Sequence, residues 1–329
     1  MDTPRSEPPH NLPPQLTSFV GREDEIRHAR ELLASTRLLT LSGAGGIGKT
    51  RLALAVAETV RSDYPDGVVF VSLVPLSDPA LVASTVMSAL GIAPSGNRPL
   101  ASSLITALAD RAILLVLDNF EHVVAAAPLV SELLSNCPKL KVLVTSRVSL
   151  HLSGEQQLPV PPLEPPGAVS DREQLGENPA VALFVQRARA IKPDFRLTDA
   201  NAQDLATICR RLDGLPLAIE LAAVRTRLLT PRAIVERLDQ QLPLLAGGPL
   251  DAPARQQTMR ATLAWSYGLL APDEQRLLRQ LSVFAGGWTL DAAQRVCDED
   301  LDTLDGLTSL IDQSLVRQVE QSDDTARFE

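Results

Sequence analysis

The chain has 329 residues, of which 45% are hydrophobic and only 3% aromatic, and its formal charge is −9. That length fits about two or three domains, and an acidic chain is poorly suited to nonspecific binding of nucleic acid or membrane surfaces. Its three cysteines are far apart, and neither a signal-peptide pattern nor a membrane-length apolar run is present. These features predict a cytoplasmic protein and exclude a disulfide-rich, zinc-binding or membrane-spanning one.

The first half of the chain has the pattern of an α/β domain. Residues 1–15 are rich in proline and are expected to form a flexible leader. From residue 16 to residue 166, short apolar runs alternate with helical stretches, which we place at 79–90, 100–110 and 123–134. Continuous apolar runs are typical of strands buried on both faces, so the alternation predicts a parallel, doubly wound sheet. The expected strands are 38–41, 68–73, 113–117 and 142–145.

A complete phosphate-binding loop follows the first expected strand. Its pattern, GxxxxGK[ST], places successive backbone N–H groups around phosphates, at the start of a helix whose N-terminus favours negative charge. Lys49 is expected to reach the β- and γ-phosphates, and the Thr50 hydroxyl to bind Mg²⁺. The loop residues are Gly43, Ala44, Gly45, Gly46, Ile47, Gly48, Lys49 and Thr50.

A carboxylate ends the third expected strand. Ligands gather at the carboxyl ends of parallel strands, so Asp118 is expected to join Thr50 at the Mg²⁺. The next residue is Asn119, whose amide can orient water but cannot act as a general base. Glu121 and His122 are alternative bases, although both also suit the start of a helix. We therefore expect slow ATP hydrolysis.

Arg147 follows the fourth expected strand and should lie at the same edge of the sheet. A guanidinium suits recognition of phosphate oxygens, so Arg147 is a candidate sensor of the γ-phosphate. A cluster of prolines then marks a boundary near residue 166. Residues 167–247 are expected to form a helical domain, in which Gly214 ends one helix and Pro216 begins the next.

Residues 248–329 combine short helices with a terminal strand pattern, which suits a winged-helix domain. From Thr258 to Glu329 there are six arginines against thirteen carboxylates, a net charge of −7. That sign opposes contact with DNA phosphates, so no direct DNA binding by this core is expected.

Taken together, these motifs resemble the NB-ARC branch of the STAND NTPases, closest to LuxR-like, repeat-bearing bacterial regulators. The segment from Val20 to Glu23 resembles the hhGRxxE element, which implies contact with the adenine. The loop, the Asp118 strand and Arg147 resemble the Walker A, Walker B and sensor 1 motifs. Residues 214–217 resemble GLPL, which implies that Pro216 lies against the nucleotide. The implied catalytic residues are Lys49, Asp118 and Arg147, the metal ligands are Thr50 and Asp118, and the nucleotide contacts are Val20, Gly21, Arg22, Gly43, Ala44, Gly45, Gly46, Ile47, Gly48, Lys49, Thr50, Arg51 and Pro216.

The resemblance implies a signalling switch that uses ATP, ADP and Mg²⁺ and self-associates on activation. An AAA+-like motor with sustained turnover is the alternative, and Asn119 argues against it. The His-Asp motif that the family carries in its winged helix has no match. We expect sensor and effector domains to lie outside this chain, on its C-terminal side.

Overall fold

The computed structural model describes residues 8–93, 98–167, 171–238, 244–248, 253–298, 300–320 and 326–329. These residues fall into two compact units. The first lies within Met1–Gly43 and Lys49–Val160, and the second within Ala44–Gly48 and Pro161–Glu329.

The first unit is built on a five-stranded sheet with the order β2-β3-β4-β1-β5, and every neighbouring pair in it is parallel. Its inner strands are buried along nearly their whole length because apolar residues occupy both faces. The strands are β1 (Leu38–Ser42), β2 (Val68–Ser72), β3 (Leu114–Asp118), β4 (Lys141–Thr145) and β5 (Glu155–Pro159).

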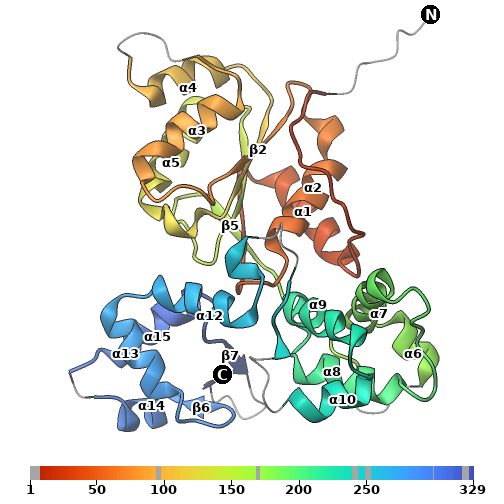
Figure 1. Cartoon of the computed structure of the whole chain (residues 1–329). Coiled ribbons are helices and arrows are strands. Elements are labelled where there is room, and N and C mark those ends of the chain that lie inside the picture. The colour runs from red at the N-terminus through yellow and green to blue at the C-terminus, as the bar shows by residue number, and fades with distance from the viewer. Residues whose placement is uncertain are drawn as a thin grey trace, which may run out of the picture. The chain divides into compact units, whose positions relative to one another are not determined.

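Helices cover both faces of this sheet. One face carries α3, α4 and α5, whose apolar side chains form a single core with β2, β3 and β4. The other carries α1 and α2, and Figure 1 shows the two groups on opposite sides of the strands. The helices are α1 (Glu23–Ser35), α2 (Lys49–Thr59), α3 (Val82–Ala89), α4 (Leu100–Leu108) and α5 (Ala127–Asn136), with 3₁₀ turns η1 (Arg61–Asp63), η2 (Pro79–Leu81), η3 (Phe120–His122) and η4 (Val124–Ala126).

Two details of this unit differ from the sequence-based expectation. Strand β5 was not among the expected strands; it pairs with β1 at the sheet edge, where Pro159 at its end is tolerated. Within the expected leader, the Asn11 side chain accepts a hydrogen bond from Phe70 N (2.6 Å) and donates one to Phe70 O (2.9 Å). The described part of that leader is therefore bonded to strand β2.

The second unit begins with a group of helices around its own core. That core contains buried residues of α7, α8 and α9, with Phe184 among the largest of them. Asn178 caps α7 by accepting hydrogen bonds from Ala180 N and Val181 N. The helices are α6 (Arg172–Glu177), α7 (Pro179–Ile191), α8 (Ala202–Arg211), α9 (Pro216–Val224) and α10 (Pro231–Arg237), with the 3₁₀ turn η5 (Arg225–Arg227).

The same unit ends in short helices and a three-stranded sheet with the order β6-β8-β7. Trp288 and Phe328 stack with ring centroids 5.1 Å apart and anchor this core. Pro272 begins α13, and Thr289 caps α14 by accepting a hydrogen bond from Ala292 N. The elements are η7 (Ala254–Gln256), α12 (Met259–Gly268), α13 (Pro272–Leu281), β6 (Trp288–Thr289), α14 (Leu290–Val296), α15 (Thr303–Asp312), β7 (Gln318–Glu320) and β8 (Ala326–Phe328).

The predicted fold class is confirmed. A parallel, doubly wound sheet of the P-loop type is followed by helices and by a winged helix. In the part of the chain that the structure describes, no helix combines the length and the apolarity needed to cross a membrane.

Candidate nucleotide-binding site

The phosphate loop joins β1 to α2 and has an unusual backbone. Gly43, Gly46 and Gly48 all have positive φ values, of 145°, 81° and 99°. Side chains rarely tolerate these conformations, so the glycines let the loop turn sharply before Lys49 begins the helix. This is the strand–loop–helix setting in which backbone N–H groups can converge on phosphates.

Lys49 is almost fully buried, at 8% exposure, and its ammonium donates a hydrogen bond to the Gly43 carbonyl at 2.6 Å. The lysine therefore lies along the loop that precedes it. A phosphate bound in the loop would offer a charged acceptor in place of a neutral carbonyl, and charged acceptors form the stronger bonds. That Lys49 contacts the β- and γ-phosphates stays a prediction.

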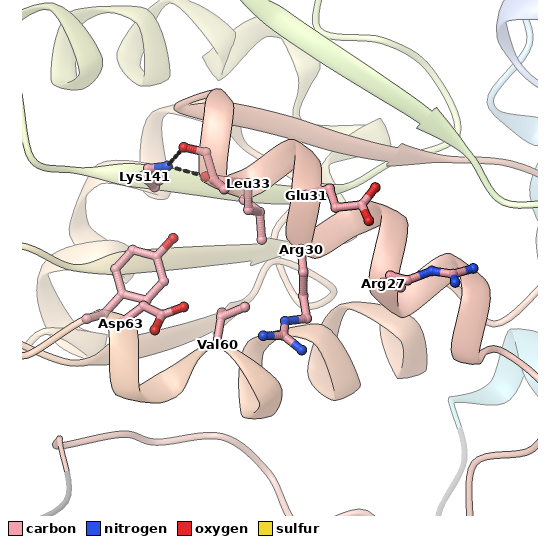
Figure 2. A pocket seen from close by; sticks show the side chains of 9 residues that line it. Arg27, Arg30, Glu31, Leu33, Val60, Asp63 and Lys141 are labelled. Carbon is pink, nitrogen blue, oxygen red and sulfur yellow. Dashed lines mark hydrogen bonds between the residues drawn. The ribbon is translucent and has the colours of Figure 1, made fainter.

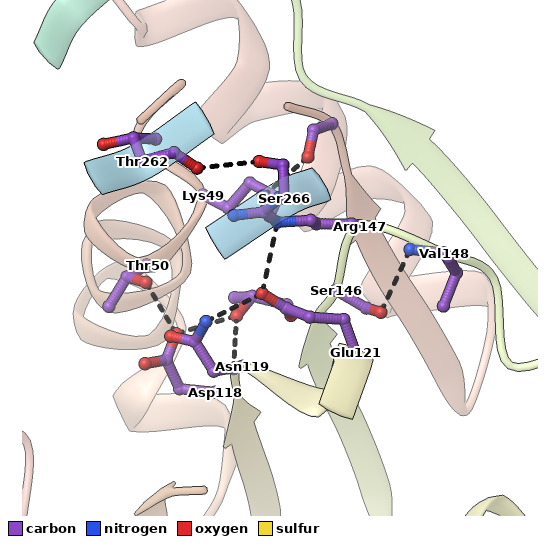
Figure 3. Close-up of polar contacts among 12 residues, drawn as sticks. Lys49, Thr50, Asp118, Asn119, Glu121, Ser146, Arg147, Val148, Thr262 and Ser266 are labelled. Carbon is purple, nitrogen blue, oxygen red and sulfur yellow. Dashed lines mark hydrogen bonds and ion pairs between the residues drawn. The ribbon is translucent and has the colours of Figure 1, made fainter. Parts of the chain in front are cut away.

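Asp118 is the centre of a polar network at the carboxyl edge of the sheet (Figure 3). Its Oδ1 atom accepts hydrogen bonds from the Thr50 hydroxyl and from the Thr145 hydroxyl, each at 2.7 Å. Thr50 comes from α2, Asp118 from β3 and Thr145 from β4, so the fold brings three elements to one carboxylate. The sequence predicts that Thr50 lies beside Asp118, whereas Thr145 was not among the predicted site residues.

Burial raises the pKa of Asp118 above its usual value, although the hydrogen bonds from Thr50 and Thr145 act in the opposite direction. The nearby Glu121 carboxylate raises this pKa further, and Lys49 lowers it. A buried carboxylate whose charged form is disfavoured by burial would gain from a cation beside it. Thr50 and Asp118 supply the hard oxygen ligands that Mg²⁺ prefers, so these residues fit a magnesium ion that would help neutralise phosphate charge.

Asn119 does not take the place of a catalytic carboxylate. Its backbone is left-handed, with φ 64° and ψ 54°, a conformation in which asparagine is among the most tolerated residues. Its backbone N–H donates to the Thr145 hydroxyl (3.0 Å), and its side-chain amide donates to Glu121 Oε1 (2.9 Å). The asparagine therefore connects β3 to β4 and orients Glu121.

Glu121 and Arg147 form an ion pair at the same edge, with 3.5 Å between Arg147 Nε and Glu121 Oε1. Both side chains are buried, at 3% and 7% exposure respectively. His122, the other proposed base, has its Nε2 atom 2.7 Å from the Leu73 carbonyl. That contact favours a structural role for His122, so Glu121 remains the candidate base in this network.

The segment expected to hold adenine is fixed to α1 and α2. Arg22 is buried and pairs with Glu25 at 2.6 Å, and Gly21 has a positive φ of 66°. Arg51 donates to the carbonyls of Thr17 (2.7 Å) and Ser18 (2.8 Å). Arg51 thus supports the segment leading to Val20, a role that its place in the sequence did not indicate.

Within the second unit, residues 214–217 lie against the loop residue Gly46. The Leu217 N–H donates to the Gly46 carbonyl at 3.2 Å. A Cβ atom added at Gly46 would be only 2.8 Å from the Leu217 Cβ atom. Pro216 begins α9, as expected, and the contact made by the following residue brings this segment to the loop.

A separate cavity of about 590 Å³ lies elsewhere in the first unit (Figure 2). Lys141, at the start of β4, lines it, and donates to the carbonyls of Leu33 and Ala34. Because the strands are parallel, this is the amino edge of the sheet, opposite the edge that carries Asp118. The cavity is therefore distinct from the candidate nucleotide site.

Two family models match the chain. One, described as an AAA domain, covers residues 32–159, and the other, described as a winged helix-turn-helix domain, covers residues 270–329. Among solved structures, the fold resembles the Walker-type ATPase PABY2304 of Pyrococcus abyssi, with a TM-score of 0.59 at 14% identity over 94% of this chain and 93% of that one. This similarity supports the fold alone.

Two mycobacterial relatives are more similar in sequence. The putative HTH-type transcriptional regulator Rv0890c of Mycobacterium tuberculosis is 44% identical over 292 residues, which is 87% of this chain. The chain spans only 32% of that regulator's length. The uncharacterized protein Rv0894 of the same organism is 39% identical over 313 residues, covering 93% of this chain and 77% of Rv0894.

These findings overturn the prediction that the core does not bind DNA directly. That prediction was wrong because a net charge summed over a segment does not describe any one face of it. Several acidic residues are engaged within the domain: Arg276 pairs with Asp300 at 2.8 Å and also contacts Asp298. Asp302 caps α15 through Asp305 N. The sum therefore overstates the negative charge available to repel a ligand.

The identity and coverage of the match to Rv0894 show the family to which this chain belongs, and the two domain matches show which domains it contains. The chain belongs to the same protein family as Rv0894 of Mycobacterium tuberculosis, with an AAA-type P-loop domain followed by a winged helix-turn-helix domain.

Proposed function

We propose that this chain is an adenine-nucleotide switch in a transcriptional regulator. The observation that carries the proposal is the 2.7 Å hydrogen bond between Thr50 and Asp118, at the carboxyl edge of the sheet and directly after a phosphate loop. The site thus offers a loop for the phosphates and two oxygen ligands for Mg²⁺, both of which ATP binding requires. The buried Lys49 adds the positive charge.

The finer assignment is to the NB-ARC branch of the STAND NTPases, with ADP favouring a closed state and ATP an open, self-associating one. Nucleotide can shift such an equilibrium only by contacting the two states differently. Arg147 suits this task because only ATP carries a γ-phosphate. The division into 16–166, 167–247 and 248–329 belongs to this proposal. Among the described residues, separate hydrophobic cores within 38–150, mainly within 175–245 and within 270–328 support it, although Leu163 packs in the second of these cores.

Slow hydrolysis is part of the proposal. The residue after Asp118 is an amide, and the carboxylate of Glu121, three residues after Asp118, is paired with Arg147. A switch needs a long-lived ATP state, whereas an AAA+-like motor turns over continuously. Steady-state phosphate release of several turnovers per second would favour the motor.

The nucleotide that accompanies the purified protein tests the switch. Denaturing the protein and separating the released nucleotide by chromatography should yield ADP or ATP in near-stoichiometric amount. Lys49→Ala protein, purified in parallel, should carry much less. A wild-type site that is empty and cannot be filled by adding either nucleotide with Mg²⁺ would contradict the proposal.

DNA contact through the winged helix is a second function, favoured by the domain match over residues 270–329. Binding of a labelled duplex from the protein's own promoter region, measured by anisotropy at several salt concentrations, tests it. The affinity should fall as salt rises, since phosphate contacts release counterions. Equal weak binding to that duplex and to unrelated sequence would argue against a specific role.

A further inference from the structure

The ion pair between Glu121 and Arg147 has a consequence for how hydrolysis is controlled. The Glu121 side chain is buried. Its Oε1 atom accepts a hydrogen bond from the Asn119 amide and forms an ion pair with the Arg147 guanidinium. Its second oxygen, Oε2, is also buried and has no hydrogen-bond partner among the described residues. Leaving a buried carboxylate oxygen without a donor is costly, so such an atom calls for a ligand.

The surroundings of Glu121 indicate which ligand this is. Glu121 follows Asp118 by three residues, in the 3₁₀ turn η3 that leaves the carboxyl end of β3. The charge of Glu121 raises the pKa of Asp118, the proposed Mg²⁺ ligand. The ion-pair partner of Glu121 is Arg147, the proposed γ-phosphate sensor. A water molecule that attacks the γ-phosphate must lie in this region, and it needs an acceptor for its proton.

We propose that Glu121 is the proton acceptor for the attacking water, and that Arg147 restrains it until a γ-phosphate is bound. This inference rests on the proposed nucleotide switch. In the step, the water oxygen bonds to the γ-phosphorus while its proton passes to the Glu121 carboxylate. The bond from the γ-phosphorus to the β–γ bridging oxygen breaks, and its electron pair leaves with ADP.

The same pair links sensing to catalysis. Without a γ-phosphate, the Arg147 guanidinium is held by Glu121. The γ-phosphate offers this guanidinium a second, more highly charged acceptor, so ATP competes with Glu121 for Arg147 whereas ADP does not. Moving Arg147 towards the phosphate would release the carboxylate for the water, while the Asn119 amide keeps it in place.

The test compares Glu121→Gln with the wild type and with Glu132→Gln, which removes one exposed carboxylate from α5 in the same unit. Glutamine keeps the shape and can still accept from Asn119, but it cannot take up a proton at neutral pH. We expect phosphate release to fall roughly 100-fold or more in Glu121→Gln, as for loss of a general base. Glu132→Gln should match the wild type.

Equilibrium titration with ATP and with ADP gives a second readout that does not depend on turnover. Because glutamine holds Arg147 less firmly, the ratio of ATP to ADP affinity should rise several-fold in Glu121→Gln. The ratio should return towards the wild-type value in the double variant Glu121→Gln with Arg147→Ala. If Glu121 had only a structural role, the variant would bind ATP and ADP more weakly by the same factor.

The outcomes separate the two proposals. If the wild type binds neither nucleotide, the nucleotide switch itself is wrong. If Glu121→Gln binds nucleotide with an unchanged ATP/ADP ratio and hydrolyses it at a rate within about 3-fold of the wild type, far from the loss expected of a base, only the role of Glu121 is overturned. Where hydrolysis is too slow to measure, the ratio alone decides.

Discussion

Gly214→Ala tests how the segment from Gly214 to Leu217 is held against the phosphate loop. Gly214 has a φ of +65° between α8 and α9, and its carbonyl accepts a hydrogen bond from Leu163 N at 3.0 Å. A Cβ atom added there would lie 1.8 Å from the Leu163 carbonyl oxygen. That atom belongs to the backbone, so no side-chain rotation can relieve the overlap.

The cost has two parts. Placing a side chain in the left-handed region costs roughly 1–2 kcal/mol. Moving the backbone apart sacrifices the bond between Leu163 and Gly214, which is worth about 1 kcal/mol. Gly214→Ala should therefore lower the free energy of unfolding by roughly 2–3 kcal/mol. Because the Leu217 N–H binds Gly46, the displacement should also weaken nucleotide binding.

Urea unfolding followed by circular dichroism measures the change, and Gly176→Ala is the matched control. Gly176 lies in α6, and its added Cβ atom would meet the Leu197 side chain at 3.8 Å, an ordinary contact. Alanine should keep or improve stability there, by about 0.5–1 kcal/mol. Equal stability of the Gly214 and Gly176 variants would refute the reasoning.

The remaining predictions concern the charged residues of the site. Lys49→Ala should weaken ATP and ADP binding by roughly 10–100-fold without unfolding the protein, as calorimetric titration would show, since one charge-assisted contact is lost. Arg147→Ala should reduce ATP affinity more than ADP affinity, and equal losses would remove Arg147 as a γ-phosphate sensor. Asp118→Asn should abolish the benefit of Mg²⁺ for binding, yet raise the melting temperature of the nucleotide-free protein at neutral pH. The sign follows from the raised pKa of Asp118. Its charge lowers the free energy of unfolding increasingly as pH rises from the ordinary pKa of 3.8, and this loss is complete above the raised pKa. The stability gained by asparagine should therefore vanish in strong acid. Asn119→Glu should not accelerate phosphate release, because a left-handed glutamate would add strain and repel Glu121; a clear gain in rate would contradict this.

The phosphate loop and the strand ending in Asp118 could be predicted because their information is local. A glycine-rich turn after an apolar run, and a carboxylate closing the next buried run, are visible in a few consecutive residues. The parallel sheet followed from the same runs, and their positions agree with the strands within about one residue, well inside the usual uncertainty of element boundaries.

The network around Glu121 could not be predicted in this way. It depends on β3 lying beside β4, which brings Thr145 to Asp118, and on the left-handed backbone of Asn119. Neither the strand order nor that backbone conformation is evident from the spacing of residues in the sequence. The signal that was available is the polar Thr145 at the end of an otherwise apolar strand.

Strand β5 was missed for a different reason. It is an edge strand with exposed glutamines, so it lacks the continuous apolar pattern of the inner strands, and the prolines around it resemble those of a linker. The mistaken exclusion of DNA binding came from treating a whole domain as a single charge.

The central claim is that ATP and ADP stabilise different arrangements of this chain, and its tryptophans can report on that. The only two in the sequence are Trp265 in α12 and Trp288 in β6, both far along the chain from the phosphate loop. Emission spectra should be recorded for the protein saturated with Mg²⁺–ADP and with a non-hydrolysable Mg²⁺–ATP analogue, after titration has established saturation. We predict spectra that differ between the two nucleotides in the wild type and coincide in Arg147→Ala, which lacks the proposed γ-phosphate sensor. Identical wild-type spectra with both nucleotides demonstrably bound would contradict the switch.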